Sequence, residues 1–517
     1  MTDAVAPGGT VTGGGAAVSD APAKALGPRP RIGLATKAGY GIGSIAFGIK
    51  DNGFRVFLLL FYNQVIGLPA STVAIAIAVA TLIDCLIDPF VGRLSDNWRG
   101  KWGRRHPFMY ASALPVALSF LLLWNPPTDW SDAGLILYLA VVIVIVRTFI
   151  VLYEIPSSAM SAELTKDYDE RAAILGWRYF FAWWGGLALT VIMFLVFLQP
   201  SEKYPIGQLN RDGYALYGYV GATLMFFSIL ISAISTHRFI PWLPQAAPKR
   251  GLSFKQGLKE VGQTLAIRPF LVITAVGLLA AIAQGVSFSL AFYFSTYFWE
   301  LNSTWTGVLV MDSFISSAIA LFAAPMLTKR SGKKFAGGVL LAASVLVGFI
   351  PFILRLMGLF PDNGDLVAGT QIPQIVPWLF LDGVIRGILG ITAAILITAM
   401  LADVVEYSEQ RTGRRDEGLF FAFTSLVQKA VSGIGVMVAG LLLTIVQFPQ
   451  NAKPSEVNPE VVTNLALIYM PVMVVLYGAA LAAMTAYNIT RESHQETVRV
   501  LAAKAQAAED ASTSQIP

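Results

Sequence analysis

Long apolar stretches alternate with short polar segments along almost the whole chain. A helix needs about 20 predominantly apolar residues to cross a bilayer, and twelve stretches come close to or exceed that length. Their approximate limits are 39–66, 71–93, 107–124, 134–157, 176–198, 215–235, 268–299, 304–328, 335–357, 374–401, 419–447 and 462–488. The pattern therefore predicts an all-α integral membrane protein with twelve transmembrane helices.

A polar segment rich in proline, residues 237–267, separates the sixth stretch from the seventh. We therefore expect a six-helix bundle over 38–236, a middle loop, and a second six-helix bundle over 268–490. Residues 1–37 form a predicted disordered tail and 491–517 a second tail. Both halves carry a short basic turn after their second stretch, which favours a transporter built from repeats with its site between them.

Basic residues gather in every second loop, for example Arg104 and Arg105 in one and Lys333 in another. Loops rich in Lys and Arg stay in the cytoplasm. The distribution predicts that both termini, both tails and the middle loop are cytoplasmic, in a multi-pass protein of the plasma membrane, the inner membrane of a bacterium.

Composition narrows the function classes. Of the 517 residues 55% are hydrophobic and 13% charged, whereas soluble proteins carry about 25% charged residues. The net charge of +5 comes from the loops and is no sign of nucleic-acid binding. The chain has a single cysteine, three widely spaced histidines and no phosphate-cradling glycine loop. We therefore expect no enzyme activity, no cofactor and no nucleic-acid partner.

Asp84 and Asp88 lie one helical turn apart inside an apolar stretch, so their carboxylates share one helix face. An acid at mid-membrane costs about 2.5–3.5 kcal/mol on insertion scales. The pair can relax by binding a proton or a metal cation, or by pairing with a base. It is therefore a candidate cation site.

Other ionisable residues lie inside predicted spans and must pair or face water. We interpret one group as a polar cavity for a charged or hydroxylated solute: Asp51, Glu154, Arg178 and Lys429. We interpret a second group as structural ion pairs: Arg147, Asp312, Asp382 and Arg386.

The basic loop after the second span either sets topology or locks a cytoplasmic gate. In the second interpretation Arg104 and Arg105 pair with acids such as Asp96, Glu163 or Asp403. Both interpretations are compatible.

Several motifs, in this order, resemble the glycoside–pentoside–hexuronide cation symporters of the major facilitator superfamily, the family of the melibiose carrier. The motifs are Lys50-Asp51, Asp84-x-x-x-Asp88-Pro89, Trp102-Gly-Arg-Arg-His-Pro107, Glu154-Ile-Pro156, Arg178-Tyr-Phe-Phe-Ala182, Ala402-Asp-Val-Val-Glu-Tyr407 and Lys429. The resemblance implies the major facilitator fold with alternating access.

The resemblance also implies residue roles. Sugar-binding positions of the family are matched by Asp51, Glu154 and Arg178, and its cation site is matched by Asp84 and Asp88. The resemblance also implies that Lys429, the lysine of the eleventh span, lies close to both sites. In that mechanism the cation binds first and raises the affinity for the solute, while Lys429 serves as counter-ion to the empty acids.

Departures from the family pattern bear on the coupling ion. Sodium-using members have a neutral amide before the second aspartate and a hydroxyl one turn before the acid of the fourth span, where this chain has Ile87 and Val151. This favours a proton over sodium, with Asp84 and Asp88 as metal ligands only if sodium is used. Ser158 replaces the family's tryptophan, so galactoside specificity does not carry over.

The sequence thus predicts a monomeric, cation-coupled symporter of a sugar, glycoside or oligosaccharide. The alternative is a symporter of a lysophospholipid or other amphiphile, for which the aromatic run Phe288–Phe294 offers apolar surface.

Overall fold

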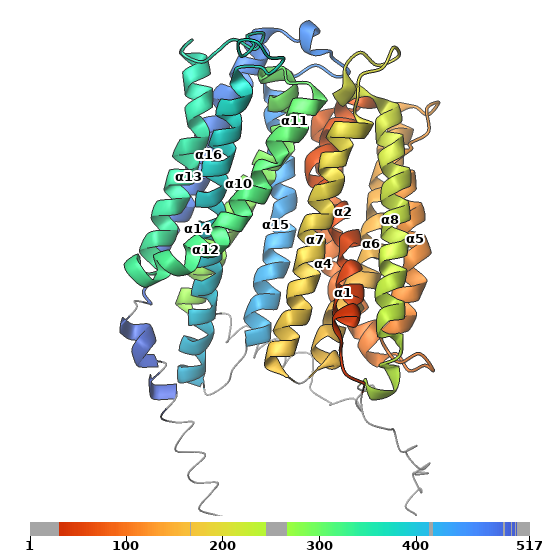
Figure 1. The fold of residues 1–517 in the computed structure, drawn as a ribbon, viewed down its shortest axis with the longest axis vertical. Coiled ribbons are helices and arrows are strands. Elements are labelled where there is room, and N and C mark those ends of the chain that lie inside the picture. The colour runs from red at the N-terminus through yellow and green to blue at the C-terminus, as the bar shows by residue number, and fades with distance from the viewer. Residues whose placement is uncertain are drawn as a thin grey trace, which may run out of the picture.

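The structure is a computed structural model that describes residues 30–165, 167–243, 266–412, 417–489, 492–497, 499–501 and 503. Within these residues the chain is helical, apart from one isolated bridge between Leu366 and Pro373 (Figure 1). The first half contains α1 (Leu34–Ile42), α2 (Ser44–Asn52), η1 (Gly53–Phe57), α3 (Leu58–Leu60), η2 (Phe61–Val65), α4 (Ala70–Asn97), α5 (His106–Trp124), α6 (Asp132–Leu164), α7 (Tyr168–Ile192), η3 (Met193–Phe197), η4 (Gly207–Leu209), α8 (Arg211–His237) and η5 (Ile240–Trp242). The second half contains α10 (Arg268–Tyr293), η6 (Phe294–Phe298), α11 (Ser303–Val310), α12 (Asp312–Ser331), α13 (Lys333–Leu356), α14 (Ile375–Thr412), α15 (Glu417–Ile445), η7 (Pro454–Glu456) and α16 (Pro459–Thr485).

Ten helices in the described residues are long and apolar enough to span a membrane. They correspond to ten of the twelve predicted spans, which confirms an all-α membrane fold. The other two predicted spans are irregular. The first runs through α1, α2 and α3 with two π-helical segments and three charged residues, and the eighth is divided at Met311 into α11 and α12.

π-Helical segments end the first, the fifth and the seventh span, at η2, η3 and η6 respectively, and the first and the seventh are the opening spans of the two halves. Such segments are rare and occur frequently at functional sites. The same irregularity at corresponding places of the two halves agrees with a chain built from repeats.

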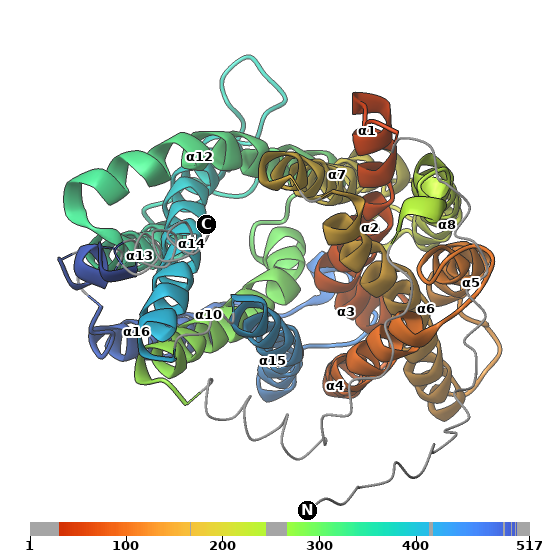
Figure 2. The ribbon, with the colours of Figure 1, turned by 90° about the horizontal axis from the view of Figure 1, so that it is seen from below.

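The two halves meet along two seams. Seen from below, α15 lies beside α4 on one flank and α12 lies beside α7 on the other (Figure 2). Packing between α4 and α15 is extensive. Gly433 sits against Thr81, and Gly440 sits against Ala74 and the backbone of Ala70. Because lipid tails are as apolar as leucine, helices in a membrane associate through such close backbone contacts.

Within the first half, α1 and α2 lie against α7 and α8. Gly48 and Gly186 face each other so closely that a side-chain carbon on either would collide with the backbone of the partner helix. This contact fixes α2, with its charged residues, against α7.

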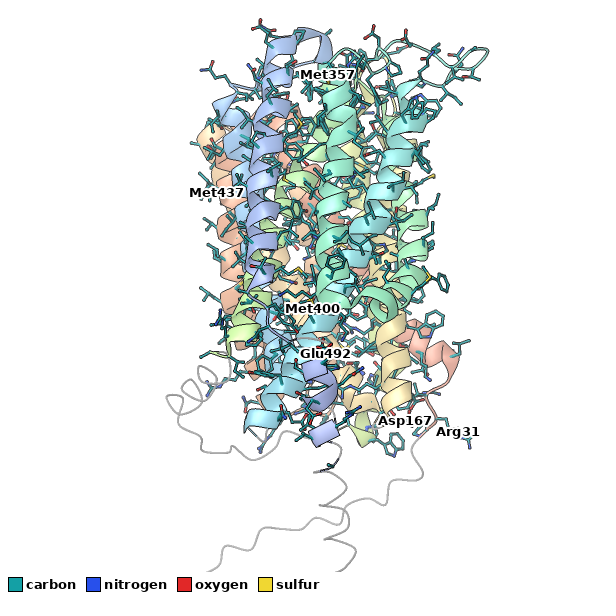
Figure 3. The ribbon with its side chains drawn as sticks, turned by 90° about the vertical axis from the view of Figure 1, so that its left-hand side faces the viewer. Arg31, Asp167, Met357, Met400, Met437 and Glu492 are labelled. Atoms are coloured by element: carbon teal, nitrogen blue, oxygen red, sulfur yellow. The ribbon has the colours of Figure 1, made fainter. Side chains whose placement is uncertain are left out.

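The first and the last parts of the described chain lie at the same end of the molecule. Figure 3 places Arg31, Asp167 and Glu492 together at this terminal end and Met357 at the opposite end. Which end faces the cytoplasm stays a prediction from the basic loops, as do the bundle limits 38–236 and 268–490. Most of the predicted middle loop and of the two tails, at 1–29, 244–265 and 504–517, lies outside the described residues.

Candidate functional site

The acid pair lies on α4, in the first half. Asp84 is only 1% exposed and Asp88, one turn further, is half-buried. The turn before the pair is fixed by Thr81, whose hydroxyl donates to the carbonyl of Ile77 at 2.8 Å. The prediction of a buried acid is confirmed for Asp84, whereas Asp88 is only half-buried.

Arg147 of α6 reaches across to the acid pair. Its Nη1 donates to Asp84 Oδ2 at 2.9 Å. The guanidinium carbon also lies 5.1 Å from the centre of the Phe54 ring, within cation–π range. The sequence predicts a structural ion pair for Arg147. The observed contact is an ion pair, but its partner Asp84 belongs to the predicted cation site.

A second group of charges lies on α2 and η1. Lys50 Nζ lies 3.7 Å from Asp51 Oδ1, and Arg55 Nη2 lies 3.1 Å from Asp51 Oδ2. Lys50 is 3% exposed and interacts electrostatically with Asp84, Arg147 and Glu154 as well. Lys50 therefore connects Asp51, the predicted substrate-binding acid of the first span, to Asp84 of the acid pair.

Arg178 of α7 is anchored by two neighbours from other helices. Its Nη1 donates to Ser157 Oγ at 2.6 Å and to the Tyr40 hydroxyl at 3.0 Å. The Tyr40 hydroxyl in turn donates to the carbonyl of Ser157, and the guanidinium lies over the Tyr40 ring at 5.1 Å. The predicted sugar-binding arginine is thus held in one orientation by α1 and α6.

Glu154 of α6 lies between the two groups. It is half-buried and interacts electrostatically with Lys50 on one side and with Arg178 on the other. The structure thereby brings the predicted substrate residues of the first half and Asp84 of the predicted cation site into one charge cluster. We call Lys50, Asp51, Asp84, Arg147, Glu154 and Arg178 the charge cluster.

Lys429 lies in α15, but its side chain is outside the described part of the structure. Its neighbours along the helix contact α4. The carbonyl of Leu426 lies 3.8 Å from Cys85 Sγ, and Gly433 lies against Thr81. The backbone of α15 therefore passes the acid pair near Lys429, and the role of that lysine stays a prediction.

The other three intramembrane charges group in the second half. Arg386 Nε lies 3.8 Å from Asp382 Oδ2, one turn away on α14, and Asp312 of α12 interacts with both electrostatically. The stem of Arg386 lies against Gly348 of α13. These contacts agree with a structural role inside the second bundle.

At the terminal end, the basic loop pairs within the first half. Glu163 Oε1 accepts from Arg104 Nη2 at 2.7 Å and from Arg105 Nη2 at 2.8 Å, and Arg105 Nη2 lies 2.6 Å from Asp96 Oδ1. Two of the suggested partners, Asp96 and Glu163, are thus observed.

The third suggested partner, Asp403, makes its ion pairs in the second half. Its Oδ1 lies 2.5 Å from Lys333 Nζ and 3.7 Å from His494 Nδ1. In this structure the candidate gate residues are therefore paired inside their own bundles, and a locking role for them stays a prediction.

At the opposite end, neutral polar side chains join the two halves. The Tyr293 hydroxyl donates to Asn63 Oδ1 at 2.8 Å, and Gln64 Nε2 donates to the Pro449 carbonyl at 2.9 Å. The Tyr297 hydroxyl lies 3.1 Å from Gln64 Oε1. We call Asn63, Gln64, Tyr293 and Tyr297 the polar seal, and all four are at most 4% exposed.

Gln64 uses its full hydrogen-bonding capacity in the seal. Nε2 donates to Asn63 Oδ1 and to the Pro449 carbonyl, while Oε1 accepts from the Tyr297 hydroxyl and from Ala452 N at 3.2 Å. An amide side chain has two donors and two acceptor positions, so none of its polar capacity is left over.

A helical membrane protein of two bundles, with buried charges gathered in the first and a hydrogen-bonded seal at one end, has the architecture of a secondary transporter. The sequence model described as "MFS/sugar transport protein" matches residues 39–491. The chain therefore belongs to this family of the major facilitator superfamily. The resemblance, the fold and a transport function rather than catalysis are confirmed, as is a multi-pass location in the membrane.

Individual proteins show the same likeness. The putative glycoside/cation symporter YagG of Escherichia coli strain K12 is 26% identical, over 92% of this chain and 98% of that protein. The isoprimeverose transporter of Lactiplantibacillus pentosus is 23% identical, over 87% and 88% respectively. The crystal structure of a D-xylose–proton symporter superposes with a TM-score of 0.60 at 13% identity, over 89% of this chain and 98% of that one. That last likeness concerns the fold alone.

Proposed function

We propose that this chain is a proton-coupled symporter of a sugar or glycoside that works by alternating access. The charge cluster supports the proposal, because Asp84 of the predicted ion site interacts electrostatically with Lys50, and Lys50 also interacts with Asp51 and with Glu154 next to Arg178. A change of charge at one group therefore alters the field at the other, as coupling requires.

Substrate recognition follows from the donors and acceptors of the cluster. Carboxylates of Asp51 and Glu154 accept hydrogen bonds from sugar hydroxyls, and Arg178 donates. Tyr40 and Ser157 hold the guanidinium of Arg178 in place before substrate arrives, which limits the entropy lost on binding. All these residues belong to one chain, so we propose that the monomer transports.

A proton is the proposed coupling ion. Hard metal cations bind through several oxygen ligands, whereas a proton needs a single carboxylate oxygen. Two positions next to the acids, Ile87 and Val151, carry no side-chain oxygen. In the proposed cycle, protonation of Asp88 precedes solute binding, and release of the proton on the other side restores the acid.

The run Phe288–Phe294 gives little support to an amphiphile as substrate. Phe292 and Phe294 are buried in packing, at 2% and 5% exposure. Phe288 is 40% exposed, and the Arg55 guanidinium lies 5.9 Å from its ring centre. The run therefore forms core more than an open apolar face.

The test is solute-dependent proton movement in proteoliposomes, followed with an external pH dye across a panel of sugars and glycosides. We expect the medium to become alkaline with at least one sugar in sodium-free buffer. The Asp88→Asn variant should lose the signal. The matched control is Asp212→Asn, which removes an acid from an exposed ion pair with Lys203 outside the cluster and should leave the signal intact.

Sugar uptake that needs sodium and moves no protons would contradict the choice of ion. If no sugar responds with either ion, the sugar proposal fails, and lysophospholipids become the next solutes to test.

A further inference from the structure

The contact between Arg147 and Asp84 is the least exposed ion pair of the charge cluster. The side chain of Asp84 is 1% exposed and that of Arg147 is 10% exposed. Arginine keeps its positive charge under all ordinary conditions. A permanent cation therefore already lies 2.9 Å from one oxygen of the acid pair.

The register between α4 and α6 shows which α6 residue is level with the second acid. Arg147 pairs with Asp84, and eight residues further on each helix Ile155 lies over Gly92, with Cγ2 3.6 Å from where a side-chain carbon on that glycine would be. Midway between these contacts, Asp88 is level with Val151. The valine is fully buried and has no side-chain oxygen.

This arrangement is poorly suited to sodium. A metal ion between the two acids would have to displace the guanidinium from Asp84, and displacement would leave a buried cation without that partner. The metal would also lack a ligand from the α6 side chain at the level of Asp88. Repulsion by the Arg147 guanidinium and the lack of a side-chain oxygen at Val151 thus both disfavour sodium binding.

We propose that Arg147 is a specificity-determining residue that excludes sodium from the Asp84/Asp88 site by acting as a fixed internal cation. The inference rests on the proposed function, since it assigns the acid pair as the ion site. It goes beyond that proposal by naming the residue that rejects the competing ion.

The experiment measures sodium binding directly and needs no sugar. Purified protein in lipid nanodiscs is titrated with sodium chloride, with choline chloride as the reference salt, by calorimetry and by thermal melting. Four proteins are compared: the natural chain, Arg147→Lys, the double variant Ile87→Asn/Val151→Thr, and the triple variant that adds Arg147→Gln to the double.

We expect a saturable sodium signal and a sodium-dependent rise in melting temperature from the triple variant. The natural chain, Arg147→Lys and the double variant should behave alike in sodium and choline. The double variant is the matched control, because it has the added oxygens and retains Arg147.

Sodium binding by the natural chain or by the double variant would overturn the proposal. So would a triple variant that melts cooperatively and still ignores sodium. A failure of the transport proposal is distinguishable, since it appears as silence of every sugar in the pH assay and leaves the sodium titrations readable.

Discussion

The two ends of the molecule are held by different chemistry. At the end that lies away from the chain termini, the opposite end, neutral amides and tyrosines of the polar seal link one bundle to the other. At the terminal end, ion pairs such as Arg104–Glu163 and Lys333–Asp403 stay within one bundle. Apart from the contact between Cys85 and Leu426, hydrogen bonds from bundle to bundle among the described residues lie at the opposite end. We infer that this conformation is closed at the opposite end.

The difference between the two ends indicates that each bundle can move as a unit. Charges paired inside a bundle keep that bundle rigid, and hydrogen bonds between bundles hold one end shut until they are exchanged for others. If the termini are cytoplasmic, as the basic loops predict, the structure is closed to the outside.

The largest expected effect is a loss of thermal stability when the ion pairs of the first bundle at the terminal end are broken. Replacing Glu163 by alanine leaves Arg104 and Arg105 without their shared acid, and breaking a buried ion pair costs about 3–5 kcal/mol. We expect a clearly lower melting temperature of the purified protein. Asp96→Ala is the control, since Asp96 is 54% exposed and pairs with the same Arg105. Its effect should stay below about 1 kcal/mol, and an equal loss from both variants would contradict this account.

An intermediate effect is expected from the seal. Gln64→Leu leaves the buried Ala452 amide without its partner, at about 1–3 kcal/mol, and also removes the partner of the half-buried Pro449 carbonyl. The population should shift roughly tenfold or more toward a state open at the opposite end. Spin labels at Ser71 and Gln450, which line a cavity of about 450 Å³ between the bundles at that end, report the opening as a longer distance in a Cys85→Ala background.

The matched control for that variant is Gln374→Leu. Gln374 is an amide at the same end, but it donates to the Leu366 carbonyl within the second half. The distance between labels should not change. If it lengthens as much as with Gln64→Leu, the seal does not depend on the contacts between bundles.

The smallest effect is expected from removing one hydroxyl. Tyr297→Phe removes the hydroxyl that lies 3.1 Å from Gln64 Oε1 and 3.0 Å from the Ala452 carbonyl, and it retains the ring packing against Phe448. A single hydrogen bond contributes about 0.5–1.5 kcal/mol, so the same labels should show a weaker shift than in Gln64→Leu. A shift larger than that of Gln64→Leu would mean that ring packing, not the hydrogen bonds, closes the opposite end.

Much of this protein follows from its sequence. The apolar stretches predict the helices, since a helix in lipid satisfies its own backbone and needs only length and apolar side chains. Buried charges stand out by their cost, so Asp84, Asp88, Glu154 and Arg178 are recognisable without a structure. Neutral residues carry no such signal: Asn63 and Gln64, near a span end, look like ordinary interfacial residues.

Tertiary structure alone decided which residues meet. Sequence spacing relates residues within one helix, so it could not name the partner of Arg147 on another helix. The observed partner of Arg147 is Asp84, on a helix 63 residues away in the chain. Arg178 likewise meets Tyr40 and Ser157 from two other helices. Such partners depend on the register at which helices pack, and that register is set by close contacts such as Gly48 with Gly186, which no local pattern encodes.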